Sequence, residues 1–252
     1  MDKQQSNFDS IKDVPDTVWE KLSKRKIYFG HQSVGYNIID GIDDVMKENP
    51  EIKLNIVETT DRTDFESGLL SNSTVGKNSD PKSKIDEFAK NIDSVIGNIA
   101  DAAALKFCYV DITSETDAEK VFEAYKGQVE KLRASYPNLA IIHFTAPLTG
   151  RQTGWKASIK KIIGREIDGA TDNIKRFEYN ELLVKEFNGK DPIFDIAKIE
   201  STFTDGARSS FEKDGQTYYS MVPEYTDDAG HLNEFGRKRA AEQFLIFLAN
   251  LS

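Results

Sequence analysis

Short apolar runs rich in β-branched and aromatic residues alternate along this chain with longer stretches of helical period. The short runs predict five strands, at 26–29, 53–57, 105–112, 139–145 and 192–196. The longer stretches predict helices at 16–24, 33–48, 83–99, 117–135, 170–187 and 233–250. Alternation of strands and helices is typical of βαβ units. We therefore expect an α/β fold, a three-layer α/β/α sandwich around a five-stranded parallel sheet.

Two stretches, 58–82 and 199–233, interrupt this alternation without a period of their own. Loops of this length inside a compact domain are usually functional or disordered. Within the second, Asp214 and Gly215 join the segments 210–213 and 216–219. Asp-Gly supplies the positive φ angles of a type I′ turn, so this part of the loop predicts a β-hairpin.

Length and composition favour one soluble globular domain. Of the 252 residues, 38% are hydrophobic and 30% charged, a balance typical of globular proteins. We expect a lead-in with a short helix at 1–25 and a single domain at 26–252. No apolar run approaches the roughly 20 residues that a membrane helix needs, so no membrane span is expected. Residues 1–13 are polar, and they neither indicate nor exclude export.

The charge balance and the cysteine count exclude several kinds of function. A net charge of −9 disfavours nucleic acid as a partner, because phosphate binding requires clustered Lys and Arg. The single cysteine, Cys108, lies in an apolar run. It cannot form an intramolecular disulfide, and we interpret it as a buried core residue. We predict neither a metal site nor a cofactor.

Candidate chemistry begins after the first predicted strand, since ligands of parallel sheets bind at the carboxyl ends of the strands. Here the sequence is Gly-His-Gln-Ser-Val-Gly at 30–35, which leads into a helix. Backbone N–H groups are unpaired at a helix start and the helix dipole favours negative charge. Ser33 is therefore a candidate nucleophile and a candidate first oxyanion donor. The alternative is that Ser33 only caps the helix.

A second candidate group precedes the last predicted helix. Asp228 stands three positions before His231 in a polar, glycine-containing loop. A turn of this spacing brings the carboxylate to one imidazole nitrogen and leaves the other nitrogen to accept a proton from a serine. His231 is thus the candidate base and Asp228 its orienting acid. Asp195, at the end of the last predicted strand, is a reserve candidate for the acid.

The early serine between the first strand and helix, together with the late Asp-x-x-His, resembles the SGNH/GDSL hydrolase superfamily over about residues 27–248. The Gly-His-Gln-Ser-Val-Gly motif resembles a divergent branch of the superfamily rather than its Gly-Asp-Ser-Leu form. The resemblance implies a flavodoxin-like α/β/α fold and a Ser33–His231–Asp228 triad. It also implies two further oxyanion donors, a glycine N–H after the second strand and an asparagine amide after the third.

The first of these donor positions has a candidate in this sequence, and the second departs from the family pattern. Gly76 is the candidate N–H donor, with Gly68 as its alternative, and Asn78 is the candidate amide. The position after the third predicted strand holds Asp111, which cannot donate when ionised. Either Asn78 substitutes there, or Asp111 has another role, such as holding a loop or orienting His31. His31, Gln32 and Asp111 are possible pocket residues, and His31 has bracing of the loop as its alternative role.

The resulting functional hypothesis is a serine esterase that hydrolyses a small acyl ester by Ser-His-Asp acyl transfer. The hydrophilic surface and long loops favour a small-molecule or carbohydrate ester over a long-chain lipid. The altered motifs leave an alternative from another class, a non-catalytic carbohydrate-binding or assembly protein on the same scaffold. A phosphate or nucleotide binder shares the sheet class, but the glycine patterns of such sites are missing after the first strand.

Overall fold

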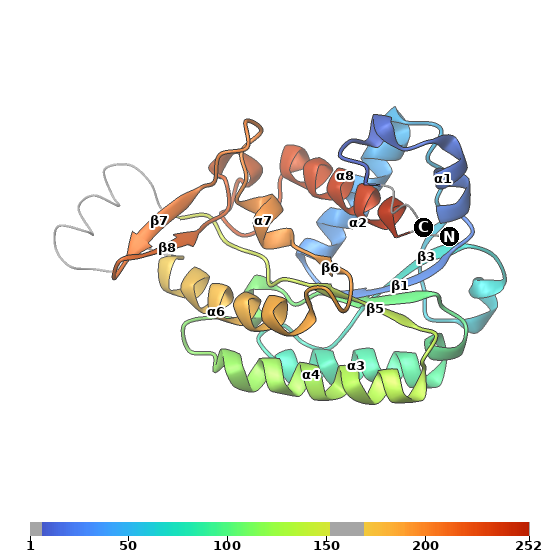
Figure 1. The fold of residues 1–252 in the computed structure, drawn as a ribbon, viewed down its shortest axis with the longest axis horizontal. Helices are drawn as coiled ribbons and strands as arrows, with labels where there is room; N and C mark the ends of the chain where they lie inside the picture. The colour runs from blue at the N-terminus through green and yellow to red at the C-terminus, as the bar shows by residue number, and fades with distance from the viewer. Residues whose placement is uncertain (1–6, 152–168, 252) are drawn as a thin grey trace.

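The computed structural model describes residues 7–151 and 169–251, which form a parallel sheet between two layers of helices (Figure 1). The sheet has six strands, and every neighbouring pair is parallel. Their spatial order is β2 (Ile56–Glu58), β3 (Leu69–Thr74), β1 (Lys26–His31), β4 (Ala102–Leu105), β5 (Ala140–Phe144) and β6 (Ile193–Phe194). The expected three-layer α/β/α architecture is confirmed, with six strands where the sequence predicted five.

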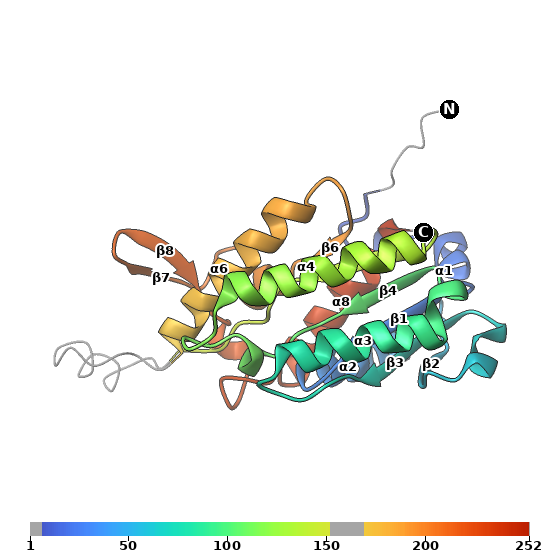
Figure 2. The same cartoon turned by 90° about the horizontal axis from the view of Figure 1, so that it is seen from below.

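Two apolar cores, one on each face of the sheet, hold the layers together. One core packs the sheet against α1 (Asp16–Leu22), α2 (Val34–Glu48), α7 (Ile196–Glu200) and α8 (Glu234–Asn250). The other packs it against α3 (Pro81–Ser94), α4 (Ala118–Ser135) and α6 (Ala170–Phe187). Figure 2 shows α3 and α4 lying side by side across the second face. Both faces are covered, as is usual for parallel sheets.

The sixth strand, β3, lies inside the segment 58–82 that the sequence predicted as irregular. Only Leu69 and Leu70 are large and apolar, and four polar residues follow them. Three of these polar side chains are satisfied inside the sheet layer: Ser71 donates to the Thr59 carbonyl, Asn72 contacts His31, and Ser73 contacts the Tyr28 hydroxyl. Buried polar groups with hydrogen-bond partners are tolerated in a core, so hydrophobicity alone missed this strand.

The prediction of a strand at 105–112 was also wrong, because the strand β4 ends at Leu105. Three alanines form most of it, and their small side chains carry little β-propensity to signal a strand. The apolar residues after Leu105 instead form a buried loop that ends in a 3₁₀ turn at Tyr109–Asp111. This loop leaves the carboxyl end of the sheet beside the turn that follows β1.

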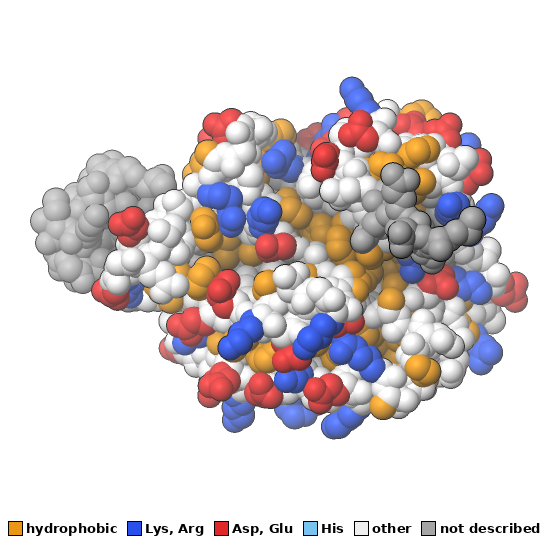
Figure 3. All heavy atoms as spheres, in the orientation of Figure 1, with side chains coloured by type: hydrophobic (Ala, Val, Ile, Leu, Met, Phe, Trp, Pro, Cys, Tyr) orange, Lys and Arg blue, Asp and Glu red, His pale blue; other side chains and the backbone are white. Residues whose placement is uncertain are grey.

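The predicted hairpin is confirmed as β7 (Ser210–Lys213) and β8 (Gln216–Tyr219), which pair antiparallel. Asp214 and Gly215 both have positive φ, at 53° and 79°, as a type I′ turn requires. On the face drawn in Figure 3, acidic and basic side chains are intermixed. None of the helices within residues 7–151 and 169–251 combines the length and the apolar character needed to cross a bilayer.

Candidate active site

Ser33 occupies a strained turn between β1 and α2. Its φ of 52° and ψ of −110° lie outside the usual regions for a residue with a side chain, and such backbone strain tends to collect at functional sites. Ser33 stands at the N-cap position of α2, yet its side chain makes no capping hydrogen bond. The capping alternative therefore does not explain this serine.

The Ser33 hydroxyl contacts His231, although the two residues are 198 positions apart. The distance from Ser33 Oγ to His231 Nε2 is 2.7 Å, and that from His231 Nδ1 to Asp228 Oδ2 is also 2.7 Å. The contact forms because α8, which follows His231, packs beside α2, which follows Ser33 (Figure 1). The Leu232 N–H also donates to Asn37 Oδ1 at 3.2 Å, which ties the histidine loop to α2.

Asp228 is held as a carboxylate by the turn in which it lies. Burial alone would raise its pKa, but three hydrogen bonds favour the charged form and place the pKa well below the usual range. They come from the His231 ring, from the His231 N–H at 2.7 Å and from the Gly230 N–H at 2.8 Å. An ionised Asp228 accepts the Nδ1 proton of His231, so Nε2 presents its lone pair to Ser33.

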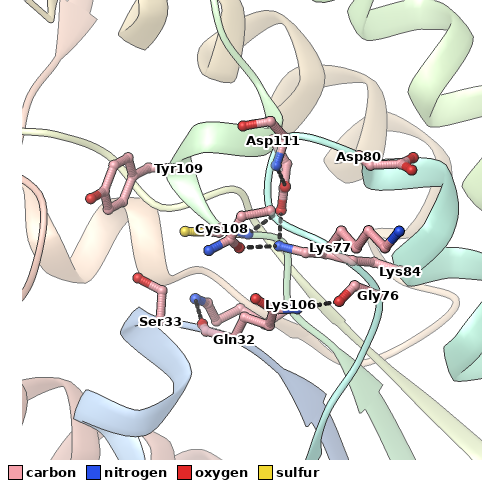
Figure 4. Close-up of polar contacts among 12 residues, drawn as sticks. Gln32, Ser33, Gly76, Lys77, Asp80, Lys84, Lys106, Cys108, Tyr109 and Asp111 are labelled. Carbon is pink, nitrogen blue, oxygen red and sulfur yellow. Dashed lines mark hydrogen bonds and ion pairs between the residues drawn. The ribbon is translucent and has the colours of Figure 1, made fainter.

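A buried ion pair orients the Asn78 amide. Lys84 Nζ lies 2.5 Å from Asp111 Oδ2, and neither side chain is exposed to solvent (Figure 4). The same ammonium donates to Asn78 Oδ1 at 2.9 Å. A lysine only donates, so the atom of Asn78 that faces it is the oxygen, and the NH₂ group points away from the pair. The sequence prediction missed Lys84, although helical spacing places it on the same face as Phe88 and Ile92.

Asp111 itself lies too deep to line a pocket. Its second oxygen, Oδ1, accepts the Ser79 N–H at 2.9 Å, and the Cys108 N–H donates to Oδ2 at 2.6 Å. Asp111 thus links the loop after β3 to the loop after β4 and neutralises Lys84. The sequence left open whether Asp111 holds a loop or orients His31, and these contacts fit the first role.

Gly76 does not offer its N–H to Ser33, because that group donates to Glu87 Oε2 at 2.7 Å. Its glycine identity has another cause: φ is +58°, and a Cβ atom would lie 2.4 Å from the Lys84 backbone nitrogen. Gln32 Nε2 donates to the carbonyls of Val75, at 2.9 Å, and Gly76. Gln32 therefore clamps the loop after β3 to the serine turn.

His31 is fully buried, which favours the bracing role over a substrate contact. Its Nε2 lies 3.1 Å from Asn72 Oδ1, and Asn72 Nδ2 donates to the Val57 carbonyl. The Asn72 oxygen therefore faces His31, and Nε2 carries the ring proton. Burial lowers the pKa of His31 to about 4, so its ring is neutral in the core.

Gly68 and Asp195, the alternative candidates for the oxyanion donor and the acid, lie away from the triad. Gly68 precedes β3 and lies against the Ser23–Lys24 backbone, at the end of the sheet opposite to Ser33. Asp195 accepts the Lys198 N–H at 3.0 Å and caps α7. Cys108 is buried, as expected.

Tyr109 borders the triad and was missed by the sequence prediction. Its ring packs edge-on against the His231 ring, with centroids 5.6 Å apart, and Figure 4 shows it near Ser33. Its side chain is half-buried. In residues 7–151 and 169–251, no cluster of three or more His, Cys, Asp or Glu has the geometry to hold a metal ion.

Solved structures of low sequence identity share this fold. A Parabacteroides merdae protein classed as a GDSL-like lipase is 10% identical, with a TM-score of 0.56 over 91% of this chain and 99% of its own. A Streptococcus pneumonia protein classed as a platelet activating factor is 12% identical, with a TM-score of 0.52 over 94% of each chain. No family model matches the sequence, and no curated protein does. This chain therefore shares its fold with these two proteins, and the likeness says nothing of its substrate or activity.

Proposed function

We propose that this protein is a serine esterase that hydrolyses a small acyl ester by two-step acyl transfer. The observation that carries the proposal is the unbroken hydrogen-bonded series from Ser33 Oγ through the His231 ring to Asp228, with both links at 2.7 Å. Nucleophile, base and orienting acid in this order are what activation of a serine hydroxyl requires.

In the first step, His231 Nε2 takes the Ser33 proton while Oγ bonds to the ester carbonyl carbon. The carbonyl oxygen becomes an oxyanion, for which the Ser33 N–H and the Asn78 NH₂ are the proposed donors. His231 then returns the proton to the leaving alcohol as the C–O bond breaks. In the second step, the same nitrogen takes a proton from water as the water oxygen bonds to the acyl carbon. The bond from that carbon to Oγ then breaks, Nε2 returns the proton to Oγ, and the acid leaves.

The proposed substrate is a small acyl group on a carbohydrate. His231 keeps 45% of its side chain exposed and Asp228 57%, so the triad lies at an open and polar surface. A long acyl chain would favour an apolar cover instead. We expect acetylated sugars to be hydrolysed with a higher kcat/KM than long-chain esters, and the opposite preference would contradict this assignment.

Two measurements on the wild-type protein test the proposed function. Hydrolysis of a small aryl acetate should be measurable, and a serine-directed phosphonate should form one adduct, located on Ser33 by peptide mass spectrometry. Denatured protein is the control, since it retains the serine but not the geometry. A folded protein with neither hydrolysis nor adduct would reject the esterase and favour the non-catalytic carbohydrate-binding or assembly protein.

The Asn78→Ala variant tests the proposed oxyanion donor. Loss of one such donor lowers kcat by about 10²- to 10³-fold in serine hydrolases, and we expect a loss of this size with little change in KM. Lys77→Ala, which alters the neighbouring exposed side chain, is the matched control and should retain full activity. An Asn78→Ala variant as active as Lys77→Ala would remove Asn78 from the mechanism.

A further inference from the structure

A second buried lysine, Lys106, lies beneath the serine turn. It follows β4 directly, and no part of its side chain is exposed. Burial of an ammonium group is unfavourable unless partners compensate it. Lys106 Nζ donates to the backbone carbonyl of Gln32 at 3.1 Å, and Figure 4 draws this contact beside Ser33. The lysine thus reaches the backbone at the residue that precedes the nucleophile.

The acceptor of this hydrogen bond shares a peptide group with the Ser33 N–H. The Gln32 carbonyl also accepts the Gly35 N–H at 3.0 Å, so two donors converge on one oxygen. A donor on a peptide oxygen polarises the group and strengthens the N–H at its other end, and a charged donor does so more strongly. The same two contacts fix the plane of the peptide, and hence the direction of the N–H, at a residue whose φ is 52°.

We propose that Lys106 is a positioning residue for the reaction: its ammonium, acting through the Gln32–Ser33 peptide, aims and strengthens the Ser33 N–H as an oxyanion donor. The inference rests on the proposed esterase function. Lys106 touches neither the substrate nor the reacting atoms in this scheme. Its effect is on the oxyanion, so it is larger in the transition state than in the bound substrate.

The groups around Lys106 affect its buried charge and determine the pH range over which that charge is lost. Burial lowers its pKa to about 8, and the titratable side chains that act on it are Cys108, Lys84, Glu200 and Asp111. Burial raises the pKa of Glu200, in turn, to about 8. As pH rises through the pKa of Lys106, the lysine loses its positive charge and the Gln32 carbonyl loses its charged donor. A Glu200 carboxylate acts in the opposite sense on Lys106, because it raises the pKa of the lysine.

The Lys106→Met variant removes the charge and the donor while keeping most of the length of the side chain. Charge-assisted hydrogen bonds have net energies that correspond to about 10- to 100-fold, and we expect kcat/KM for a small aryl acetate to fall by that factor. Affinity for a boronic acid, which forms a tetrahedral adduct on Ser33, should fall in parallel. Affinity for the non-hydrolysable amide analogue of the substrate should change by less than about threefold. Lys126→Met on α4 is the matched control.

Two results would overturn the role of Lys106: unchanged kcat/KM in a folded Lys106→Met variant, or equal weakening of boronate and amide binding, which indicates a merely structural role. Where substitution prevents folding, the wild-type pH profile decides. After correction for spontaneous hydrolysis, kcat should decline as pH rises through about 8, and a plateau across that range overturns the inference. Absence of any wild-type esterase activity would instead reject the proposed function.

Discussion

Replacement of Ser33 by alanine is expected to lower kcat for a small aryl acetate on the order of 10⁴- to 10⁶-fold, if Ser33 is the nucleophile of the proposed esterase. The physical reason is that the hydroxyl which attacks the carbonyl is removed, while the Ser33 N–H stays in place. The fold should be retained, because the side chain caps no helix and, within residues 7–151 and 169–251, hydrogen-bonds to His231. Initial rates and a thermal unfolding curve measure both expectations.

Two further variants test whether Ser33 and His231 act together and whether loss of any serine has the same effect. Ser33 and His231 act as one unit, so the double variant Ser33→Ala/His231→Ala should lose no more activity than either single variant. Ser94→Ala, at the exposed carboxyl end of α3, is the control for serine removal as such. Full activity in Ser33→Ala would show that hydrolysis takes place at another site.

Breaking the buried Lys84–Asp111 pair should have the largest effect on stability. Lys84→Met leaves the Asp111 carboxylate buried without its cation, and loss of one partner of such a pair typically costs about 3–5 kcal/mol. The free energy of unfolding, from urea titrations at neutral pH, measures this effect. Kcat should fall as well, since the Asn78 amide loses the group that orients it.

The second substitution at the pair separates charge from shape. Adding Asp111→Asn to Lys84→Met removes the unpaired charge and keeps one acceptor oxygen, which can serve only one of the Ser79 and Cys108 N–H groups. We expect the double variant to regain part of the lost stability. Lys82→Met breaks an exposed pair with Asp86 and should change stability by less than about 1 kcal/mol. A Lys84→Met variant no less stable than Lys82→Met would refute the assigned importance of the buried pair.

The sequence predicted the parts of this molecule that carry a local signal. Helical periods located the long helices within a few residues, and Asp-Gly at 214–215 located the hairpin. Ser33 was predicted from its place between the first strand and helix, Asp228 and His231 from their spacing, and the three together from the family resemblance; the structure places their side chains at hydrogen-bonding distance. Their catalytic roles stay a prediction until the variants are measured.

The parts that the sequence did not predict depend on tertiary partners. β3 is a strand despite its polar residues, because neighbouring strands and side chains satisfy them. The sequence predicted Gly76 as an oxyanion donor, but its N–H donates to the Glu87 carboxylate on α3, eleven positions along the chain. Lysine is normally a surface residue, so neither Lys84 nor Lys106 was considered for the site. The available signals were the apolar helix face that includes Lys84 and the apolar run that contains Lys106.

The separation of Ser33 from His231 along the chain has a consequence for biosynthesis. Ser33 leaves the ribosome early, but its partner arrives 198 residues later and is held in place by α8. A nascent chain therefore carries an inert serine until the last helix has emerged and docked against α2. Acquisition of phosphonate reactivity would then report the moment at which α8 has emerged and docked against α2.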